Sequence, residues 1–179
     1  MSNSRKKVIV RRFSGDTLPG YLPHADFVRN HAIELLDLSG RILPLPLNDI
    51  KTICYVRDFN LADTQNPERL TRRAFFARPR SEGLWLRLTF RSGDLLEGLA
   101  PIDIALTDDL INDTGLHLTP PDTRSNTQRL FVPRTSLTEI QLIAVITTPS
   151  RRKPLPASSV PSLQEDLFDN LIPPNTRPN

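Results

Sequence analysis

Short runs of alternating apolar and polar residues dominate the first 146 positions of this 179-residue chain. Such alternation predicts β-strands, because successive side chains of a strand point to opposite faces of a sheet. The clearest run is LWLRLTF at 84–90, followed by a Ser-Gly-Asp turn and a second strand at 95–100. Glycine suits this turn because it adopts positive φ without steric cost. The pattern therefore predicts a β-hairpin over 84–100.

The same hairpin pattern occurs near the N-terminus, where residues 8–23 read VIVRRFSGDTLPGYLP. Gly15 and Gly20 align with Gly93 and Gly98 at one common spacing. Later strands follow in the same order in both copies, and the length differences fall between strands, where loops tolerate them. The expected strands are 8–13, 17–22, 32–38, 42–47 and 52–56 in the first copy, and 84–90, 95–100, 115–119, 129–133 and 137–146 in the second.

A tandem pair of small barrels accounts for these two copies. We expect an all-β fold of two five-stranded SH3-like barrels, because closing a short sheet removes its exposed edges. The expected divisions are 1–60 for the first barrel, 61–83 for a basic linker, 84–148 for the second barrel and 149–179 for a disordered, Pro-rich tail. A short helix is predicted within the linker, since Asn66-Pro67-Glu68 places Pro at a first helical position.

The first copy resembles the Sm-like family, the small bent barrels of spliceosomal Sm proteins and bacterial RNA chaperones. The residues that carry the resemblance are Gly15, Asp16, Gly20, Asp26 and Asn30, which follow the spacing of the family's first motif. In the second copy Thr107 stands in place of the Asn. The family's Arg-Gly pair is missing from both copies, where Pro46-Leu47 and Pro133-Arg134 stand instead. Segment 120–134 is also similar to uncharacterised bacterial proteins. The resemblance implies RNA as the ligand and Asn30 as one of its contacts.

Charge is distributed unevenly along the chain. Residues 1–91 hold 16 Lys or Arg against 9 Asp or Glu, whereas residues 92–179 hold 7 against 11. The linker places arginines around Phe75 and Phe76, which suits either phosphate and base contacts or a clamp on the acidic second half. The candidate nucleic-acid or anion-binding residues are Arg11, Arg12, Asn30, Arg69, Arg72, Arg73, Arg78 and Arg80.

Catalytic and metal-binding patterns are missing from the sequence. His24, His31 and His117 have no ligand spacing with Cys54, and no nucleophile motif or Gly-rich phosphate loop occurs. Asp108-Asp109 is interpreted as a solvated loop pair. We therefore expect a non-enzymatic protein without a metal centre or cofactor.

The single cysteine and the absence of a long apolar run indicate the cellular compartment of the protein. One cysteine cannot form a disulfide within the chain, which favours a reducing compartment. No run of 18 apolar residues and no secretory signal are present. The expected location is the cytoplasm, without membrane association.

Two further peptides suggest partners. In the tail, QEDLF resembles the peptides by which bacterial proteins bind the replicative sliding clamp, with Gln164, Leu167 and Phe168 as the expected contacts. The spacing of Lys7 and Arg11, together with Asp37-Leu38-Ser39, resembles part of a bacterial cyclic-dinucleotide receptor motif. The leading expectation is a binding or scaffold module for RNA or another phosphate-bearing ligand. A protein adaptor that acts through the barrel seam and the tail is the first alternative, and a degenerate cyclic-dinucleotide receptor is the second.

Overall fold

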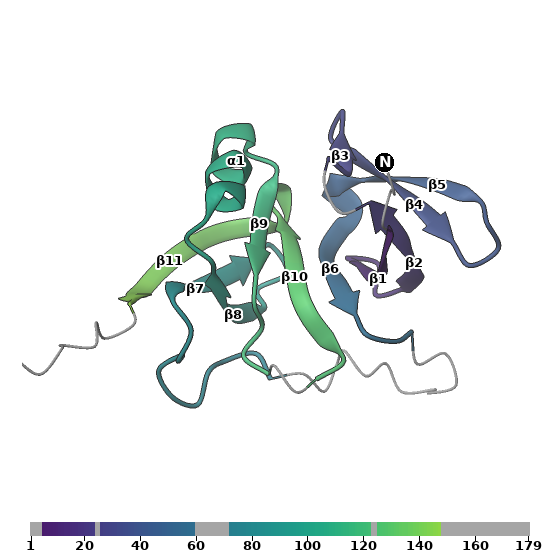
Figure 1. Ribbon diagram of the computed structural model, residues 1–179. Coiled ribbons are helices and arrows are strands. Elements are labelled where there is room, and N and C mark those ends of the chain that lie inside the picture. The colour runs from purple at the N-terminus through teal and green to yellow at the C-terminus, as the bar shows by residue number, and fades with distance from the viewer. Residues whose placement is uncertain (1–4, 24–25, 60–71, 123–124, 148–179) are drawn as a thin grey trace, which may run out of the picture. The chain divides into compact units, whose positions relative to one another are not determined.

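The computed structural model describes residues 5–23, 26–59, 72–122 and 125–147, all of which belong to the compact unit Met1–Thr148. The first half contains β1 (Arg5–Arg12), β2 (Thr17–Pro23), β3 (Val28–Arg29), β4 (Ala32–Asp37), β5 (Ile42–Pro46) and β6 (Ile50–Val56). The second half contains β7 (Gly83–Phe90), β8 (Leu95–Ala100), the helix α1 (Ile104–Asn112), β9 (Gly115–Leu118), β10 (Thr127–Pro133) and β11 (Leu137–Ile146). Figure 1 shows these strands with α1 at one end of the second half, near β9, so the predicted mainly-β fold is confirmed.

Both halves place their strands in the same order. In the first half the order is β6-β1-β2-β4-β5. In the second half β11-β7-β8 form one sheet, the bridge between Leu99 and Thr119 connects β8 to the end of β9, and β9 pairs with β10. All ten predicted strands are present with ends within a few residues of the expected ones. The sequence did not predict β3 or α1, and both lie between the second and third repeated strands of their halves.

The two hairpin turns share their backbone geometry. Gly15 and Gly93 have φ values of 94° and 82°, and their N–H groups donate to Arg12 and Phe90 at 3.2 and 2.8 Å. Positive φ explains the glycine at this turn position. Gly20, one strand later, is required for a different reason, because a Cβ there would lie 2.6 Å from a backbone oxygen of β4. The predicted repeat of this hairpin is confirmed.

The two halves are joined by β-pairing. Strand β10 of the second half pairs antiparallel with β6 of the first. One eight-stranded sheet therefore runs through both halves in the order β3-β4-β2-β1-β6-β10-β9, with β5 on β4. Among the described residues β5 does not pair with β6, nor β10 with β11, so two separate closed barrels are not confirmed. Alternation specifies that a segment is a strand, but it does not specify the partner at each edge.

The two apolar cores exchange residues across this junction. Cys54 and Ile9 of the first half are buried in the core of the second half. In return, Phe131 of β10 is buried in the core of the first half beside Ile53. Neighbouring residues of a strand face opposite sides, so the β6–β10 pair contributes to both cores. Each half thus completes the core of the other.

The described part of the linker, residues 72–82, contains neither helix nor strand. The predicted helix start at 66–68 lies outside the described residues, as does the predicted disordered tail over 149–179. Within the described chain, no helix is long and apolar enough to cross a membrane.

Candidate functional site

A cavity rich in basic side chains lies at the β6–β10 junction, and we call it the junction cavity. Its interior volume is about 60 Å3, and the figure is about 580 Å3 when all space around it, open solvent included, is counted. Its cations are Arg11 of β1, Lys51 of β6, and Arg72 and Arg73 of the linker. The apolar part of the lining comes from Cys54, Phe90, Leu95, Leu96, Pro120 and Leu130. The cavity therefore combines positive charge with an apolar surface.

Strand register explains how distant residues reach this cavity. Arg11 of β1 lies opposite Thr52 of β6, and Cys54 of β6 lies opposite Leu130 of β10. Thr52 and Cys54 are two positions apart and share a face of the strand. The alternation that builds the junction therefore aligns three strands along one wall of the cavity.

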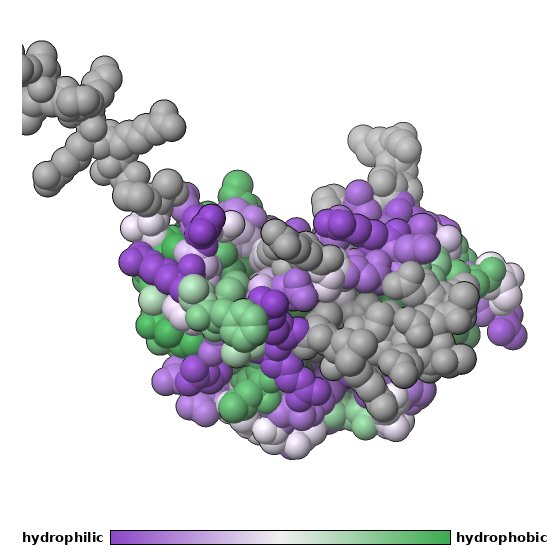
Figure 2. All heavy atoms as spheres, turned by 90° about the horizontal axis from the view of Figure 1, so that it is seen from below, coloured by the Kyte–Doolittle hydropathy of each residue, from purple (hydrophilic) through white to green (hydrophobic). Residues whose placement is uncertain are grey.

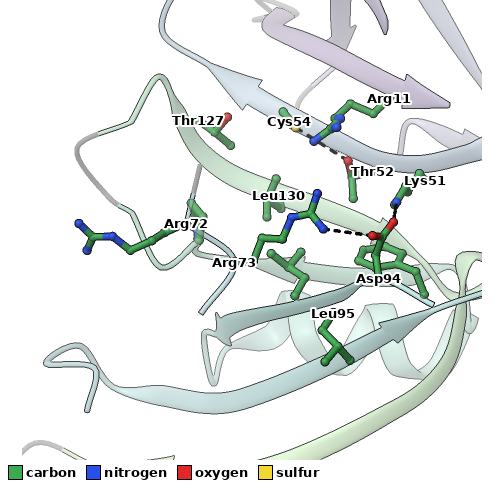
Figure 3. Close-up of a pocket in the computed structure, with 13 residues that line it drawn as sticks. Arg11, Lys51, Thr52, Cys54, Arg72, Arg73, Asp94, Leu95, Thr127 and Leu130 are labelled. Atoms are coloured by element: carbon green, nitrogen blue, oxygen red, sulfur yellow. Dashed lines mark hydrogen bonds and ion pairs between the residues drawn. The ribbon is translucent and has the colours of Figure 1, made fainter. Parts of the chain in front are cut away.

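One carboxylate, that of Asp94, stands among these cations. It is the only acidic residue among the described residues that line the cavity. Figure 3 shows Lys51 and Arg73 reaching it from two sides, while Arg72 points away. Lys51 forms a close ion pair with Asp94, and Arg73 Nη1 donates to it at 3.1 Å. The hydrogen bond from Lys51, followed by that from Ser92, lowers the pKa of Asp94 to about 2.

The linker reaches the cavity because it is bound to β8. The N–H of Glu97 donates to the Arg73 carbonyl at 2.6 Å, and the Glu97 carboxylate accepts the N–H of Phe75 at 3.0 Å. The same carboxylate accepts from Trp85 Nε1 at 3.2 Å and from Arg87 Nη2 at 2.9 Å. Burial alone would raise the pKa of Glu97, but the hydrogen bonds from Phe75, Arg87 and Trp85 outweigh it and lower the pKa. Glu97 is therefore a buried anchor for the segment that carries Arg73.

The two linker phenylalanines have different environments. Phe75 is partly buried and packs edge-on against Trp85, with ring centroids 5.7 Å apart. Phe76 is 83% exposed, and the Arg72 guanidinium stacks 3.9 Å from the centre of its ring. The sequence allowed two interpretations of this segment, packing between the barrels or contact with an anionic ligand. In the structure Phe75 packs on Trp85, whereas Phe76 is exposed.

Several predicted binding residues lie elsewhere. Arg12 pairs with Asp16 and Asp49 at the first hairpin turn. Arg78 and Arg80 are exposed and do not line the junction cavity. Four predicted residues lie outside the described part of the chain, namely Arg69, Gln164, Leu167 and Phe168.

Lys51 was missed by sequence reasoning, although it is the only basic residue in the strand over 50–56. Its partner Asp94 lies 43 positions along the chain. Local spacing therefore gave no signal that pairs the two.

Asn30, the contact implied by the Sm-like resemblance, lines a second cavity. That cavity contains Phe131, the strand neighbour of Leu130, so it lies on the other face of the β6–β10 pair. Here Asp109 Oδ2 lies 2.8 Å from His117 Nδ1, and it accepts the backbone N–H of His117 at 3.2 Å. The interpretation of Asp109 as a solvated loop residue is wrong, because α1 carries it onto β9, where its side chain is 12% exposed. Among the described residues, no three His, Cys, Asp or Glu side chains form a metal-ligand group.

Tyr55 of β6 contributes a buried hydroxyl near this second cavity. Its ring lies 6.2 Å from that of His117, and the hydroxyl has no hydrogen-bond partner in the described structure. Burial raises the pKa of Tyr55 to about 12, so the phenol is neutral at physiological pH.

Two residues of the cyclic-dinucleotide resemblance, Asp37 and Lys7, contact other residues of the first half. The Asp37 carboxylate accepts the backbone N–H groups of Ser39 and Arg41 at 2.9 and 2.7 Å. Lys7 lies 3.6 Å from the carboxylate of Asp58. Asp37 therefore stabilises the turn between β4 and β5.

Comparison with known families covers both halves of the chain and the linker. The model of a family of unknown function, DUF6982, matches residues 4–144. The chain belongs to the DUF6982 family. No curated protein and no solved structure matches the chain. The DUF6982 match spans every residue that lines the junction cavity, so this cavity lies within the family's own region.

Proposed function

We propose that this chain is a non-enzymatic binding module that takes a phosphate-bearing ligand, with RNA as the leading class, in the junction cavity. The observation that carries the proposal is that four cationic residues, from β1, β6 and the linker, line a cavity whose described lining contains a single carboxylate. Lys and Arg neutralise phosphates and release condensed counterions, which is the main source of nucleic-acid affinity. Among the described residues, the lining of the second cavity has no comparable excess of positive charge.

The mixed lining favours a nucleotide unit over a bare inorganic anion. Cys54 and Leu130 provide an apolar wall against which a base or sugar can pack. Arg72, which lines the cavity, stacks on the ring of Phe76, a residue that is 83% exposed. Exposed aromatic rings interleaved with arginines bind successive bases of single strands by stacking. A single-stranded segment therefore fits these contacts better than a duplex does.

Small bent barrels remain our proposal for the two halves, and the shared strand order supports it. The RNA proposal does not rest on the motif of that family, because Asn30 lies on the other face of the junction from Arg11 and Lys51. It rests on the charge of the junction cavity alone.

The test is fluorescence anisotropy with a labelled single-stranded RNA and the full chain. Arg72→Glu/Arg73→Glu should weaken binding by about tenfold or more, because two positive charges of the cavity lining become negative. The matched control, Arg78→Glu/Arg80→Glu, makes the same charge change in the same linker but outside the cavity. It should change the affinity by less than about threefold, the effect expected of screened surface charges.

Salt dependence separates this proposal from the protein-adaptor alternative. Binding of RNA should weaken steeply with salt, with a log-log slope of about −0.7 for each phosphate neutralised. An equal loss in both double variants would show that general linker charge, not the cavity, attracts the ligand. Absence of RNA binding by the wild-type chain would refute the proposal.

A further inference from the structure

Strand β11 is a long edge strand with an apolar surface. One of its edges pairs with β7 along Gly83–Phe90, and in the described part of the chain no strand pairs with the other. Ile140, Leu142 and Val145 are 39%, 54% and 49% exposed, and Glu139 is the only charged residue of the strand. Figure 2 shows hydrophobic residues at the surface on its left side, the side on which β11 ends in Figure 1.

The edge strand β5 of the larger sheet is protected. Strand β5 pairs only with β4, along Ile42–Pro46. Pro44 and Pro46 are two positions apart, so their missing N–H donors face the same side of the strand. Since pairing with β4 is retained, that side is the open edge, where proline blocks the addition of a strand. Strand β11 contains no proline and no lysine. The β5 edge is therefore blocked by proline, whereas β11 lacks both residues and carries two register shifts in its ladder to β7, between Leu137 and Glu139 and between Leu142 and Ala144.

The fold itself shows what the available edge accepts. Strand β6 is the repeat equivalent of β11, because it lies beside β1 as β11 lies beside β7. On its second edge β6 binds β10 in antiparallel register. The same edge of β11 therefore has the geometry to take an extended strand.

Repeating the β6–β10 contact between two copies would require β5, the repeat equivalent of β10. Pro44 stands in β5 at the repeat position that Phe131 occupies in β10, and Phe131 is opposite Ile53 of β6. A proline there cannot donate to the partner strand. Head-to-tail addition of copies through β5 is therefore blocked, and β11 is left to pair with its own counterpart.

We propose that β11 is a dimerisation strand that pairs antiparallel with β11 of a second copy of this chain. A register centred on Leu142 places Leu142 opposite its counterpart and Glu139 opposite Val145. This register keeps the two glutamates apart and places Leu142 against Leu142 and Ile140 against Ala144. The two β11-β7-β8 sheets join across a twofold axis into one sheet of twice the width. The inference does not depend on the proposed ligand.

Sedimentation velocity of the full chain over a concentration series tests the proposal. The wild-type chain should sediment as a dimer, and Leu142→Lys should weaken dimerisation by about 100-fold, because two lysines face each other across the twofold axis. The matched control is Ile42→Lys, a similar residue that is 61% exposed on the blocked β5 strand, and it should leave the dimer intact. Unchanged far-UV circular dichroism spectra for both variants would show that the folds are retained.

Hydrogen exchange distinguishes a second copy from other occupants of the edge. In the dimer, amides of β11 should become more protected as the protein concentration rises, and Leu142→Lys should remove that gain. A wild-type chain that remains monomeric at high concentration overturns the proposal. A dimer that Leu142→Lys does not weaken also overturns it, because the interface would then lie elsewhere. Protection of β11 that is independent of concentration overturns it as well, because a segment of the same chain would then cover this edge.

Discussion

At the residue scale, Asp94 determines the electrostatics of the junction cavity. It follows the Ser-Gly of the second hairpin turn, a position that the first repeat fills with Asp16. Asp16 pairs with Arg12 of its own hairpin, whereas Asp94 pairs with Lys51 and Arg73 from other segments. The same turn residue therefore serves a local contact in one copy and connects three segments in the other.

The stability contributed by Asp94 should depend on pH in the acid range. Its pKa is about 2 in the folded chain against an ordinary value of 3.8. Folding therefore favours the charged form, and the contribution is fully present above the ordinary pKa and is lost as the pH falls through about 2. Urea unfolding of the wild type and Asp94→Asn should differ by a constant amount near neutral pH and converge near pH 2. A difference that persists unchanged into strong acid would contradict this role.

Asp94 should also oppose ligand binding. Its carboxylate occupies Lys51 and Arg73, the same cations that a phosphate would use. Asp94→Asn should therefore tighten RNA binding by about threefold or more at low salt, opposite in sign to Arg72→Glu/Arg73→Glu. Anisotropy titrations at two salt concentrations measure the change. Weaker binding by Asp94→Asn would show instead that the carboxylate positions Lys51 and Arg73 for the ligand.

At the element scale, the linker segment next to β8 holds the arginines in place. Its hydrogen bonds with Glu97 and the packing of Phe75 on Trp85 bind residues 73–75 to β7 and β8. Glu97 is 5% exposed, and a buried carboxylate is stable only when donors satisfy it. The linker provides one of those donors, so the position of the segment and the burial of Glu97 depend on each other.

Phe75→Ala and Phe76→Ala should therefore differ in their effect on stability. Phe75 is partly buried, and its truncation should lower the free energy of unfolding by about 1–3 kcal/mol, less than for a fully buried phenylalanine. Phe76 is 83% exposed, and its loss should change stability by less than about 0.5 kcal/mol. Urea unfolding followed by the fluorescence of Trp85, the single tryptophan, measures both. Equal effects would show that Phe75 does not pack as described.

At the scale of the whole molecule, the exchange of core residues makes the two halves depend on each other. Phe131 is 1% exposed and lies in the first-half core, although its strand belongs to the second half. Cys54 lies in the second-half core in the reciprocal way. A chain with this arrangement should unfold as one cooperative unit rather than as two tandem domains.

Phe131→Ala tests that cooperativity. Truncation of this buried ring should lower the free energy of unfolding by about 3–5 kcal/mol. Trp85 fluorescence, a probe in the second half, and far-UV circular dichroism, a probe of both halves, should report the same shifted transition. Ile42→Ala, which truncates a residue that is 61% exposed on β5, is the control and should shift neither. Two separate transitions would show that the halves fold independently.

The sequence by itself determined the strands, the hairpin turns and the repeat, because these depend on local properties. Alternation over 84–90 and 137–146 marks strands wherever they pack, and Gly15 and Gly93 set their turns through their own φ angles. It did not reveal α1, because Ile104–Asn112 exposes Ile104, Leu110 and Ile111 and its apolar periodicity is weak. It did bring Arg11, Arg72 and Arg73 into consideration, since positive charge can be counted without a structure.

The tertiary structure alone decided which edges pair and which charges meet. Side-chain alternation specifies the two faces of β6 and β10, but every strand offers the same backbone donors and acceptors at its edges, so the partner is chosen by the long-range packing of the cores. The β6–β10 pairing brings Lys51 to Asp94 and places Arg11 opposite the linker. The fold of α1 onto β9 brings Asp109 to His117. These contacts join residues whose separation along the chain carries no signal, because non-local pairing depends on how the whole chain buries its apolar surface.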